Sequence, residues 1–104
     1  MRADTDSLNH VILSWQPNKE PDLTKYYVYR SHGSDKPAIV DSLIANINDS
    51  LCSWTDIEPI MQFIPVNYFV SAVDSSGLES VKSANSEIRY DSSGRIIITN
   101  HEYD

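Results

Sequence analysis

Three histidines and one cysteine are the residues of this 104-residue chain best suited to nucleophilic or acid–base chemistry. His10, His32 and His101 stand singly near strand or chain ends, and no motif around them would position a catalytic partner. Cys52 alternates with Trp54 in a short apolar run, so we expect a half-buried core thiol. The sequence therefore predicts a protein without catalytic residues, which is not an enzyme.

Acidic residues gather at Asp4 to Asp6, at Glu20 to Asp22 and at Asp49. A site for a hard cation needs several oxygen ligands at regular spacing on one loop, and none of these places has that pattern. We expect a solvated acidic surface, with no metal and no cofactor. Asn48 to Ser50 reads N-D-S, a formal glycosylation sequon, but such triplets also arise often by chance.

Charge and composition exclude several kinds of partner. The chain has 8 Lys+Arg against 15 Asp+Glu and a net charge of −7. It therefore has no basic surplus with which to displace counterions from a nucleic acid. No apolar run approaches the roughly 20 residues of a membrane-spanning helix, so we expect no membrane insertion. One cysteine allows no internal disulfide. The remaining class is a single acidic globular domain.

The elements that must position these residues are β-strands, because apolar and polar residues alternate with period two. Branched and aromatic residues enrich each run, and turn residues separate the runs. The predicted strands lie at His10–Trp15, Lys25–Arg30, within Ile39–Ile47, Leu51–Thr55, Tyr68–Val73, about Ala84–Tyr90, and Arg95–Thr99. About seven short strands with turns between them indicate an all-β immunoglobulin-like sandwich.

Two identical tetrads, Asp-Ser-Ser-Gly, stand at Asp74–Gly77 and Asp91–Gly94. Asp at the first position can accept a hydrogen bond from the backbone two residues on, and Gly at the fourth accepts a left-handed conformation. The sequences that flank the two tetrads do not match. We therefore predict two turns rather than an internal duplication.

Three stretches resemble one known family in their order and spacing. Val11–Pro17 reads VxLxWxP, Leu23–Ser31 reads LxxYxVYRS, and Asn67–Ser80 reads NYxVxAVDxxGxxS. Trp54–Asp56 supplies the aromatic residue, Thr and Asp that often precede that family's E–F connection. Together they resemble a bacterial-type fibronectin type III domain, with the three stretches as its B, C and F strands. The resemblance covers residues 8–90.

The resemblance also implies roles for core residues. Trp15 would pack between the two sheets. Tyr68 would be the tyrosine corner of the fold, its hydroxyl bonded to the backbone upstream in the E–F connection. The other residues expected to face the core are Tyr26, Val28, Val70 and Ala72.

The two ends of the chain depart from the family pattern. The usual first strand is expected to be missing or truncated, because only Met1–Ser7 precede the B strand. Residues 91–104 follow the last expected strand and hold the isoleucine-rich Arg95–Thr99 and an acidic tail. We expect this segment to fold back as an antiparallel hairpin strand. The alternatives are a homodimer through residues 95–99 and, third, a disordered tail.

Four apolar residues alternate away from the predicted core on the C and F strands. They are the predicted binding residues Tyr27, Tyr29, Phe69 and Val73. Adjacent strands would place them in cross-strand contact, and a contiguous apolar patch often marks an interface. The competing interpretation is that they stiffen the sheet or lie under long neighbouring side chains.

The function predicted from these features is a non-catalytic protein-interaction or spacer module of a larger, secreted or surface protein. Its partners would be neighbouring domains or another protein chain. The alternative is a carbohydrate-binding accessory module of a glycan-degrading enzyme, in which Tyr27, Tyr29 and Phe69 stack on sugar rings. The chain has neither Arg-Gly-Asp nor a W-S-x-W-S motif, so integrin binding and a cytokine-receptor role have no support.

Overall fold

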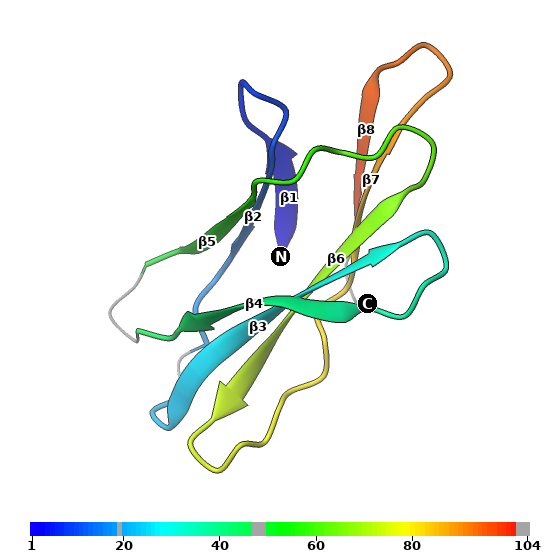
Figure 1. Cartoon of the computed structure of the whole chain (residues 1–104). Helices are drawn as coiled ribbons and strands as arrows, with labels where there is room; N and C mark the ends of the chain where they lie inside the picture. The colour runs from blue at the N-terminus through cyan, green and yellow to red at the C-terminus, as the bar shows by residue number, and fades with distance from the viewer. Residues whose placement is uncertain (19, 47–49, 102–104) are drawn as a thin grey trace.

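The computed structural model describes residues 1–18, 20–46 and 50–101, and these residues form strands and no helix (Figure 1). Two antiparallel sheets make a sandwich, one of three strands in the order β1-β2-β5 and one of five in the order β4-β3-β6-β7-β8. The predicted all-β sandwich is confirmed, with eight strands instead of about seven. The strands are β1 Arg2–Thr5, β2 Val11–Trp15, β3 Leu23–His32, β4 Ala38–Ile44, β5 Cys52–Asp56, β6 Val66–Asp74, β7 Ser86–Tyr90 and β8 Ile96–Asn100.

The core lies between the two sheets and follows the period-two alternation of the strands. In β2, Val11, Leu13 and Trp15 are buried and alternate with half-buried residues. Trp15 meets the edge of the Tyr26 ring at a centroid distance of 5.5 Å, so it packs between the sheets as expected. Each such side chain contributes roughly 1.5–3 kcal/mol by leaving water. The other residues expected to face the core, Val28, Val70 and the half-buried Ala72, belong to the same cluster.

The first strand is present in short form, as the four-residue β1 paired with β2. A turn that the sequence analysis did not identify reverses the chain between them. The Asp6 amide donates to the His10 carbonyl at 3.0 Å, and the Asn9 amide donates to the Asp6 carbonyl at 3.0 Å. Asn9 takes the left-handed conformation, with φ of 60°. Asn tolerates this conformation better than most residues, so it stands where a Gly is usual.

The two predicted Asp-Ser-Ser-Gly turns are confirmed, and the turn at Asp6 has the same hydrogen bonds. In each turn one Asp side-chain oxygen accepts from the amides two and four residues later, at 2.8–3.0 Å. These hydrogen bonds hold the pKa of each aspartate below its usual value. The largest cause is the hydrogen bond from His10 for Asp6, from Ser76 for Asp74 and from Ser93 for Asp91. Each of these turns therefore favours the ionised form of its aspartate.

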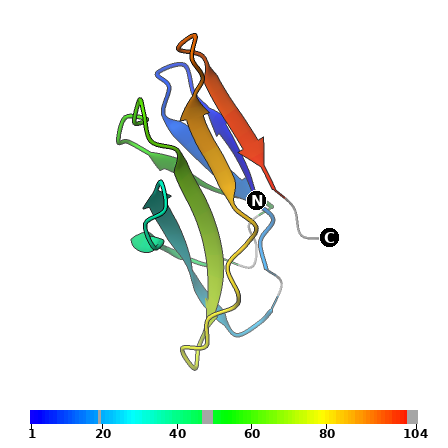
Figure 2. The ribbon, with the colours of Figure 1, turned by 90° about the vertical axis from the view of Figure 1, so that its right-hand side faces the viewer.

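The isoleucine-rich segment forms β8, which pairs antiparallel with β7. Of the three alternatives for this segment, the structure has the intramolecular hairpin. β8 lies at the outer edge of the five-stranded sheet, where Figure 2 shows it beside β7. Ile96 and Ile98 pack against the core from this edge.

One long side of the sandwich, which we call the β1–β8 side, is bridged by Asn100. The Ala3 amide donates to Asn100 Oδ1 at 2.8 Å, and Asn100 Nδ2 donates to the Ala3 carbonyl at 3.3 Å. The buried Ser86 hydroxyl also donates to Asn100 Oδ1, at 2.6 Å. The side-chain amide thus supplies the donor and the acceptor that a neighbouring strand would offer to Ala3.

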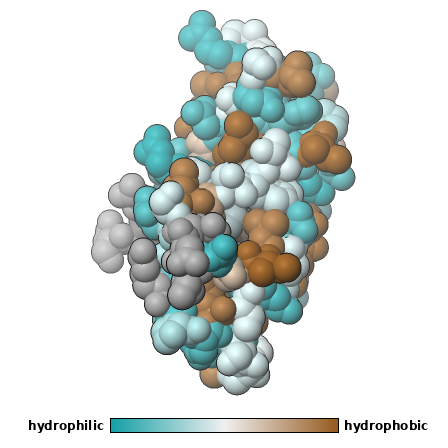
Figure 3. Space-filling view, turned by 90° about the vertical axis from the view of Figure 1, so that its left-hand side faces the viewer, coloured by the Kyte–Doolittle hydropathy of each residue, from teal (hydrophilic) through white to brown (hydrophobic). Residues whose placement is uncertain are grey.

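The opposite long side, the β4–β5 side, is bridged by Trp54, whose Nε1 donates to Asp41 Oδ2 at 2.8 Å. Beyond this bond the two sheets leave a crevice of about 330 Å³, lined in part by Leu43, Leu51 and Cys52. Figure 3 faces this side and shows, among the described residues, apolar side chains scattered between polar ones.

Candidate functional site

The predicted binding residues lie on the side of the five-stranded sheet that is turned away from the three-stranded sheet, which we call the outer face. β3 and β6 pair in a register that sets Tyr29 directly opposite Phe69, and Val73 opposite Lys25. The rings of Tyr27 and Tyr29 meet edge to face, with centroids 6.4 Å apart. The structure therefore brings all four residues together on one face.

Their exposure divides the four residues into two pairs. Tyr29 is 7% exposed and Val73 is 3% exposed. Tyr27 and Phe69 are half-buried. Because a partner can touch only exposed area, Tyr29 and Val73 offer almost nothing for binding. Only Tyr27 and Phe69 keep the surface that the sequence analysis assigned to all four.

The cover over Tyr29 comes from the segment that connects β6 with β7. The Glu79 carboxylate accepts hydrogen bonds from the Tyr29 hydroxyl and, at 2.6 Å, from the Ser71 hydroxyl. Lys82 Nζ lies 4.5 Å from the centre of the Tyr29 ring. The hydrogen bonds from Ser71 and Tyr29 lower the pKa of Glu79, while burial and the Glu79 carboxylate raise the pKa of Tyr29. The interpretation that long neighbours cover the aromatic residues thus applies to Tyr29.

Two serines hold this connecting segment along the edge of β6. The Ser80 amide donates to the Ala72 carbonyl, and the Ala72 amide donates to Ser80 Oγ at 2.9 Å. Ser83 repeats the arrangement with Val70, whose amide donates to Ser83 Oγ at 3.0 Å. Because hydroxyls replace backbone carbonyls as acceptors, the segment follows β6 without becoming a regular strand. It carries Glu79 and Lys82 onto the outer face.

β4 adds two isoleucines to the outer face that the sequence analysis did not assign to it. Ile39 is paired opposite Tyr29 and is 50% exposed, and Ile44 is paired opposite Lys25 and is 90% exposed. Their positions differ by an odd number of residues, so strict alternation would put them on opposite faces. A bulge that leaves Val40 without a partner in the register changes the alternation. The one signal in the sequence is the adjacent apolar pair Ile39 and Val40.

The exposed part of the outer face is therefore an apolar surface centred on Tyr27, Phe69 and Ile39. Lys25 Nζ lies 5.0 Å from the centre of the Tyr27 ring, so a cation borders it. Such a surface can bury apolar area against another molecule, and its aromatic rings suit protein interfaces.

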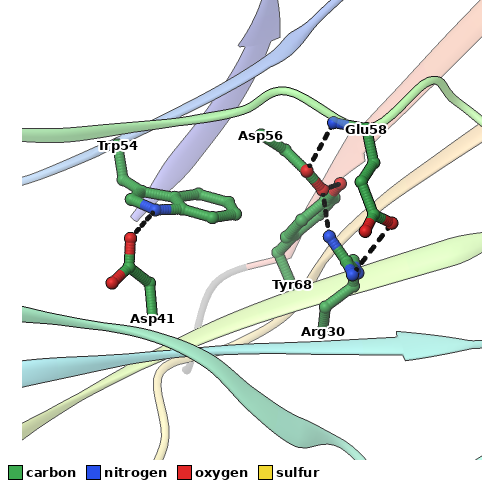
Figure 4. A network of polar contacts seen from close by, with 6 residues as sticks. All are labelled: Arg30, Asp41, Trp54, Asp56, Glu58 and Tyr68. Carbon is green, nitrogen blue, oxygen red and sulfur yellow. Dashed lines mark hydrogen bonds and ion pairs between the residues drawn. The ribbon is translucent and has the colours of Figure 1, made fainter.

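A second cluster, which we call the Asp56 cluster, joins the sheets and consists of Arg30, Asp56, Glu58 and Tyr68. Figure 4 shows the Asp56 side chain reaching from β5 toward Arg30 and Tyr68 on the opposite sheet. Asp56 Oδ2 accepts from the Tyr68 hydroxyl at 2.6 Å and from Arg30 Nη1 at 2.7 Å. Asp56 Oδ1 accepts from the Glu58 amide at 3.0 Å. The Asp56 residue is only 3% exposed.

The Asp56 cluster corrects the predicted role of Tyr68. The Tyr68 hydroxyl was expected to bond to backbone upstream, and its partner is instead the upstream carboxylate of Asp56. Burial, followed by the hydrogen bond to Asp56, raises the pKa of Tyr68 far above its usual value. Burial alone would lower the pKa of Arg30, but the hydrogen bond and charge of Asp56 outweigh it and raise that pKa. Since both Asp56 oxygens already accept hydrogen bonds, we interpret the cluster as structural.

The other chemically suited residues stay apart from one another. Cys52 is buried in the core opposite Trp15, as its alternation indicated. His10 Nδ1 lies 3.3 Å from Asp6 Oδ2 within the first turn, and His101 is exposed. Among the described residues, no group of three or more His, Cys, Asp or Glu side chains is arranged to hold a metal ion. Asn48 and Asp49 of the sequon at 48–50 lie outside the described residues.

No helix in the described part of the chain has the length and hydropathy to cross a bilayer. Comparison of the chain with protein-family models gives no match, and comparisons with curated proteins and with solved structures give none either.

Proposed function

We propose that this chain is a non-catalytic, fibronectin type III-like module that binds another protein through its outer face. The fibronectin type III assignment rests on the sequence stretches given above, on the two-sheet architecture and on Trp15 between the sheets. The partner is a neighbouring domain or a separate chain, and the parent is a larger secreted or surface protein in which the module also acts as a spacer.

The observation that supports binding at this face is the half-exposed pair Tyr27 and Phe69 on a rigid base. Their neighbours Tyr29 and Ser71 are both fixed by Glu79. A surface whose side chains are already ordered loses little conformational entropy when a partner binds. Aromatic residues on such surfaces contribute much of the binding energy of protein interfaces.

The same residues argue against the carbohydrate-binding alternative. A sugar ring stacks on the open face of an aromatic ring. Lys25 Nζ lies over the Tyr27 ring and Lys82 Nζ lies over the Tyr29 ring, so a cation already occupies one face of each. The two rings are also inclined at 87°, which offers no common plane to a glycan chain.

Site-specific photocrosslinking in the full natural protein tests the proposal. A photoreactive phenylalanine analogue replaces Tyr27, and a control places it at Ser53, which is exposed on the three-stranded sheet. We expect a discrete crosslink from position 27, absent from position 53 and lost when Phe69→Ser is added. Equal crosslinking from both positions, or crosslinking that Phe69→Ser leaves unchanged, would show that the outer face is not the binding surface.

A titration of the ¹⁵N-labelled chain with a broad panel of glycans tests the alternative. The proposal expects no saturable shift of the Tyr27 and Phe69 amides. A saturable shift at these amides that Tyr27→Ser abolishes would replace the protein-binding proposal with carbohydrate binding.

A further inference from the structure

The sandwich has four edge strands, β1 and β5 in one sheet and β4 and β8 in the other. The outward amides and carbonyls of an edge strand can template pairing with another chain, and proteins commonly block them. The hydrogen bonds of each edge show which of the four strands is blocked.

The edge of β1 is occupied. Along an antiparallel ladder, hydrogen-bonded and non-hydrogen-bonded residue pairs alternate. Asp6 and His10 form a hydrogen-bonded pair, so counting back along β1 leaves the backbone groups of Ala3 and Thr5 pointing outward. Asn100 takes both groups of Ala3. The Thr5 amide donates to the side chain of the preceding Asp4 at 2.8 Å. A strand that approached β1 would have to displace both partners.

The middle of the β4 edge is protected in the same way. The outward Ser42 amide donates to Oδ1 of the preceding Asp41 at 2.7 Å. The bulge at Val40 also interrupts the straight edge that a partner strand needs. In both β1 and β4, an aspartate that is itself bonded to the sheet accepts the next, outward amide.

The edge of β8 has no such protection. The Asp91 amide bonds the Arg95 carbonyl at 2.8 Å and the His101 amide bonds the Asn85 carbonyl at 3.0 Å. The alternation between these bonds turns Ile97 and Thr99 toward β7 and leaves the amides and carbonyls of Ile96, Ile98 and Asn100 pointing outward. No described residue accepts from or donates to them. The strand, Ile-Ile-Ile-Thr-Asn, contains no charge and no proline.

The fourth edge, β5, is the useful contrast. Its outward backbone groups belong to Ser53 and Thr55 by the same alternation. The outward side chains are the hydroxyls of these two exposed residues, and the strand ends at the acidic Asp56. A partner strand there would bury little apolar area, whereas on β8 it would lie beside three isoleucines.

We propose that the outer edge of β8 pairs antiparallel with β8 of a second copy of this chain. In this arrangement the outward amides and carbonyls of one β8 bond to those of the other. Ile98 then lies on the two-fold axis opposite Ile98 of the second copy, and Ile96 lies opposite Asn100 of the second copy. The apolar centre is thus self-complementary, and no charged residue of the strand meets a like charge. Arg95, which flanks the strand, lies opposite His101. The two five-stranded sheets become one continuous sheet.

The dimer is weak and depends on concentration. Five paired residues from each copy bury less than the about 1,200 Å² at the lower end of stable interfaces. The net charge of −7 on each copy adds repulsion that salt screens. Association therefore belongs in the high-micromolar range or above, and salt strengthens it.

Sedimentation velocity and ¹⁵N NMR of the full chain, from tens of micromolar to millimolar, test the pairing. We expect the average mass to rise toward a dimer with concentration. The amides of Ile96 and Ile98 should shift and become protected from hydrogen exchange, while those of Ser53 and Thr55 stay unchanged. This measurement on the wild-type chain needs no variant.

A variant copies the protection found on the other two edges. Ile97→Asp puts a carboxylate before the outward Ile98 amide, as Asp4 stands before Thr5 and Asp41 before Ser42. We expect at least a tenfold weaker association. Ile97→Thr, a branched polar residue without a carboxylate, is the matched control and should dimerise as the wild type does.

Three results would overturn the proposal. One is a wild-type chain that stays monomeric through the millimolar range. Another is a dimer whose shifts map away from β8 or persist fully in a folded Ile97→Asp variant. The third is a β8 edge whose Ile96 and Ile98 amides do not shift at millimolar chain but do shift when an unrelated strand-forming peptide is added. That result would assign the β8 edge to a different protein.

Discussion

On the β1–β8 side the two sheets are joined by an uncharged amide, whereas on the opposite side they are joined by carboxylates. Asn100 offers Ala3 a donor and an acceptor, much as a paired strand would. On the β4–β5 side and just inside it, Asp41 accepts from Trp54, and Asp56 accepts from Arg30 and Tyr68.

The difference shows that the two sides depend on different conditions. An amide that replaces backbone pairing demands exact geometry but has no charge, so pH and salt hardly affect it. A carboxylate depends on its surroundings, because burial without a partner is costly and exposure weakens its hydrogen bonds. Asp56 is buried and Asp41 is exposed, so the β4–β5 side contains both extremes.

The largest effect should come from Asp56→Ala. The change leaves the Arg30 guanidinium, whose side chain is 14% exposed, without its buried partner. Loss of one member of a buried ion pair costs about 3–5 kcal/mol of the free energy of unfolding. Urea unfolding measures it, with Asp41→Ala as the exposed-carboxylate control, expected below about 1 kcal/mol. Equal losses in the two variants would contradict the assigned difference in burial.

Asn100→Ala should follow, with a loss of about 2–3 kcal/mol, because it removes both hydrogen bonds to Ala3 and leaves the buried Ser86 hydroxyl without its acceptor. Thermal and urea unfolding measure it. Thr99→Ala, one residue earlier and exposed, is the control and should stay within about 0.5 kcal/mol of wild type. If Asn100→Ala unfolds at the wild-type midpoint, the amide does not hold β1 to β8.

Tyr68→Phe should cost about 1–2 kcal/mol at neutral pH, because the Asp56 carboxylate keeps Arg30 as a partner. The folded pKa of Tyr68 is raised, so its contribution is complete below the unfolded pKa of about 10 and declines as pH rises above that value. The gap between wild type and Tyr68→Phe should therefore shrink above pH 10. The gap for Asn100→Ala should stay constant, and a parallel decline of both gaps would contradict the comparison.

The smallest effect should come from Trp54→Phe. The change removes the Nε1 donor to Asp41 and keeps an aromatic ring beside Tyr68, whose ring centroid lies 6.2 Å from that of Trp54. Because water can replace an exposed hydrogen bond, we expect a loss below about 1 kcal/mol. A loss as large as that of Asn100→Ala would show that the β4–β5 side is held by this bond after all.

The turns show where sequence reasoning succeeded and where it did not. The Gly residues of Asp74–Gly77 and Asp91–Gly94 made both turns predictable from the sequence. The turn at Asp91–Gly94 in turn predicted the hairpin that ends in β8. Asp6–Asn9 makes the same hydrogen bonds with Leu and Asn at its third and fourth positions. The first strand was expected to be missing or truncated because only Met1–Ser7 precede the B strand, and without a Gly the turn that joins β1 to β2 was not recognised.

On the outer face, alternation placed Tyr27, Tyr29, Phe69 and Val73 correctly together, because the register of β3 and β6 is constant from Lys25 to His32. Alternation contains no information about what covers a face. The segment that buries Tyr29 follows β6 through serine hydroxyls, and a serine in a sequence gives no sign of such a role.

The Asp56 cluster could be predicted only in part. The tyrosine and an acidic residue upstream were both recognised from the family resemblance, but not as partners. Their bond depends on Arg30, which pairs opposite Tyr68 across the β3–β6 ladder and compensates the buried charge. Pairing between residues so distant along the chain is a property of the register and not of any local pattern.

The three aspartate turns also bear on how quickly the chain folds. Each closes a loop of only a few residues, so the hairpins β1–β2 and β7–β8 have local partners and should form within about 1–10 μs. β3 and β6, in contrast, must find each other across about forty residues, and such distant pairings slow folding. We therefore expect the rate-limiting step to be the docking of β6 onto β3. Because the hairpins form before this step, substitutions in their turns should change the folding rate more than the unfolding rate.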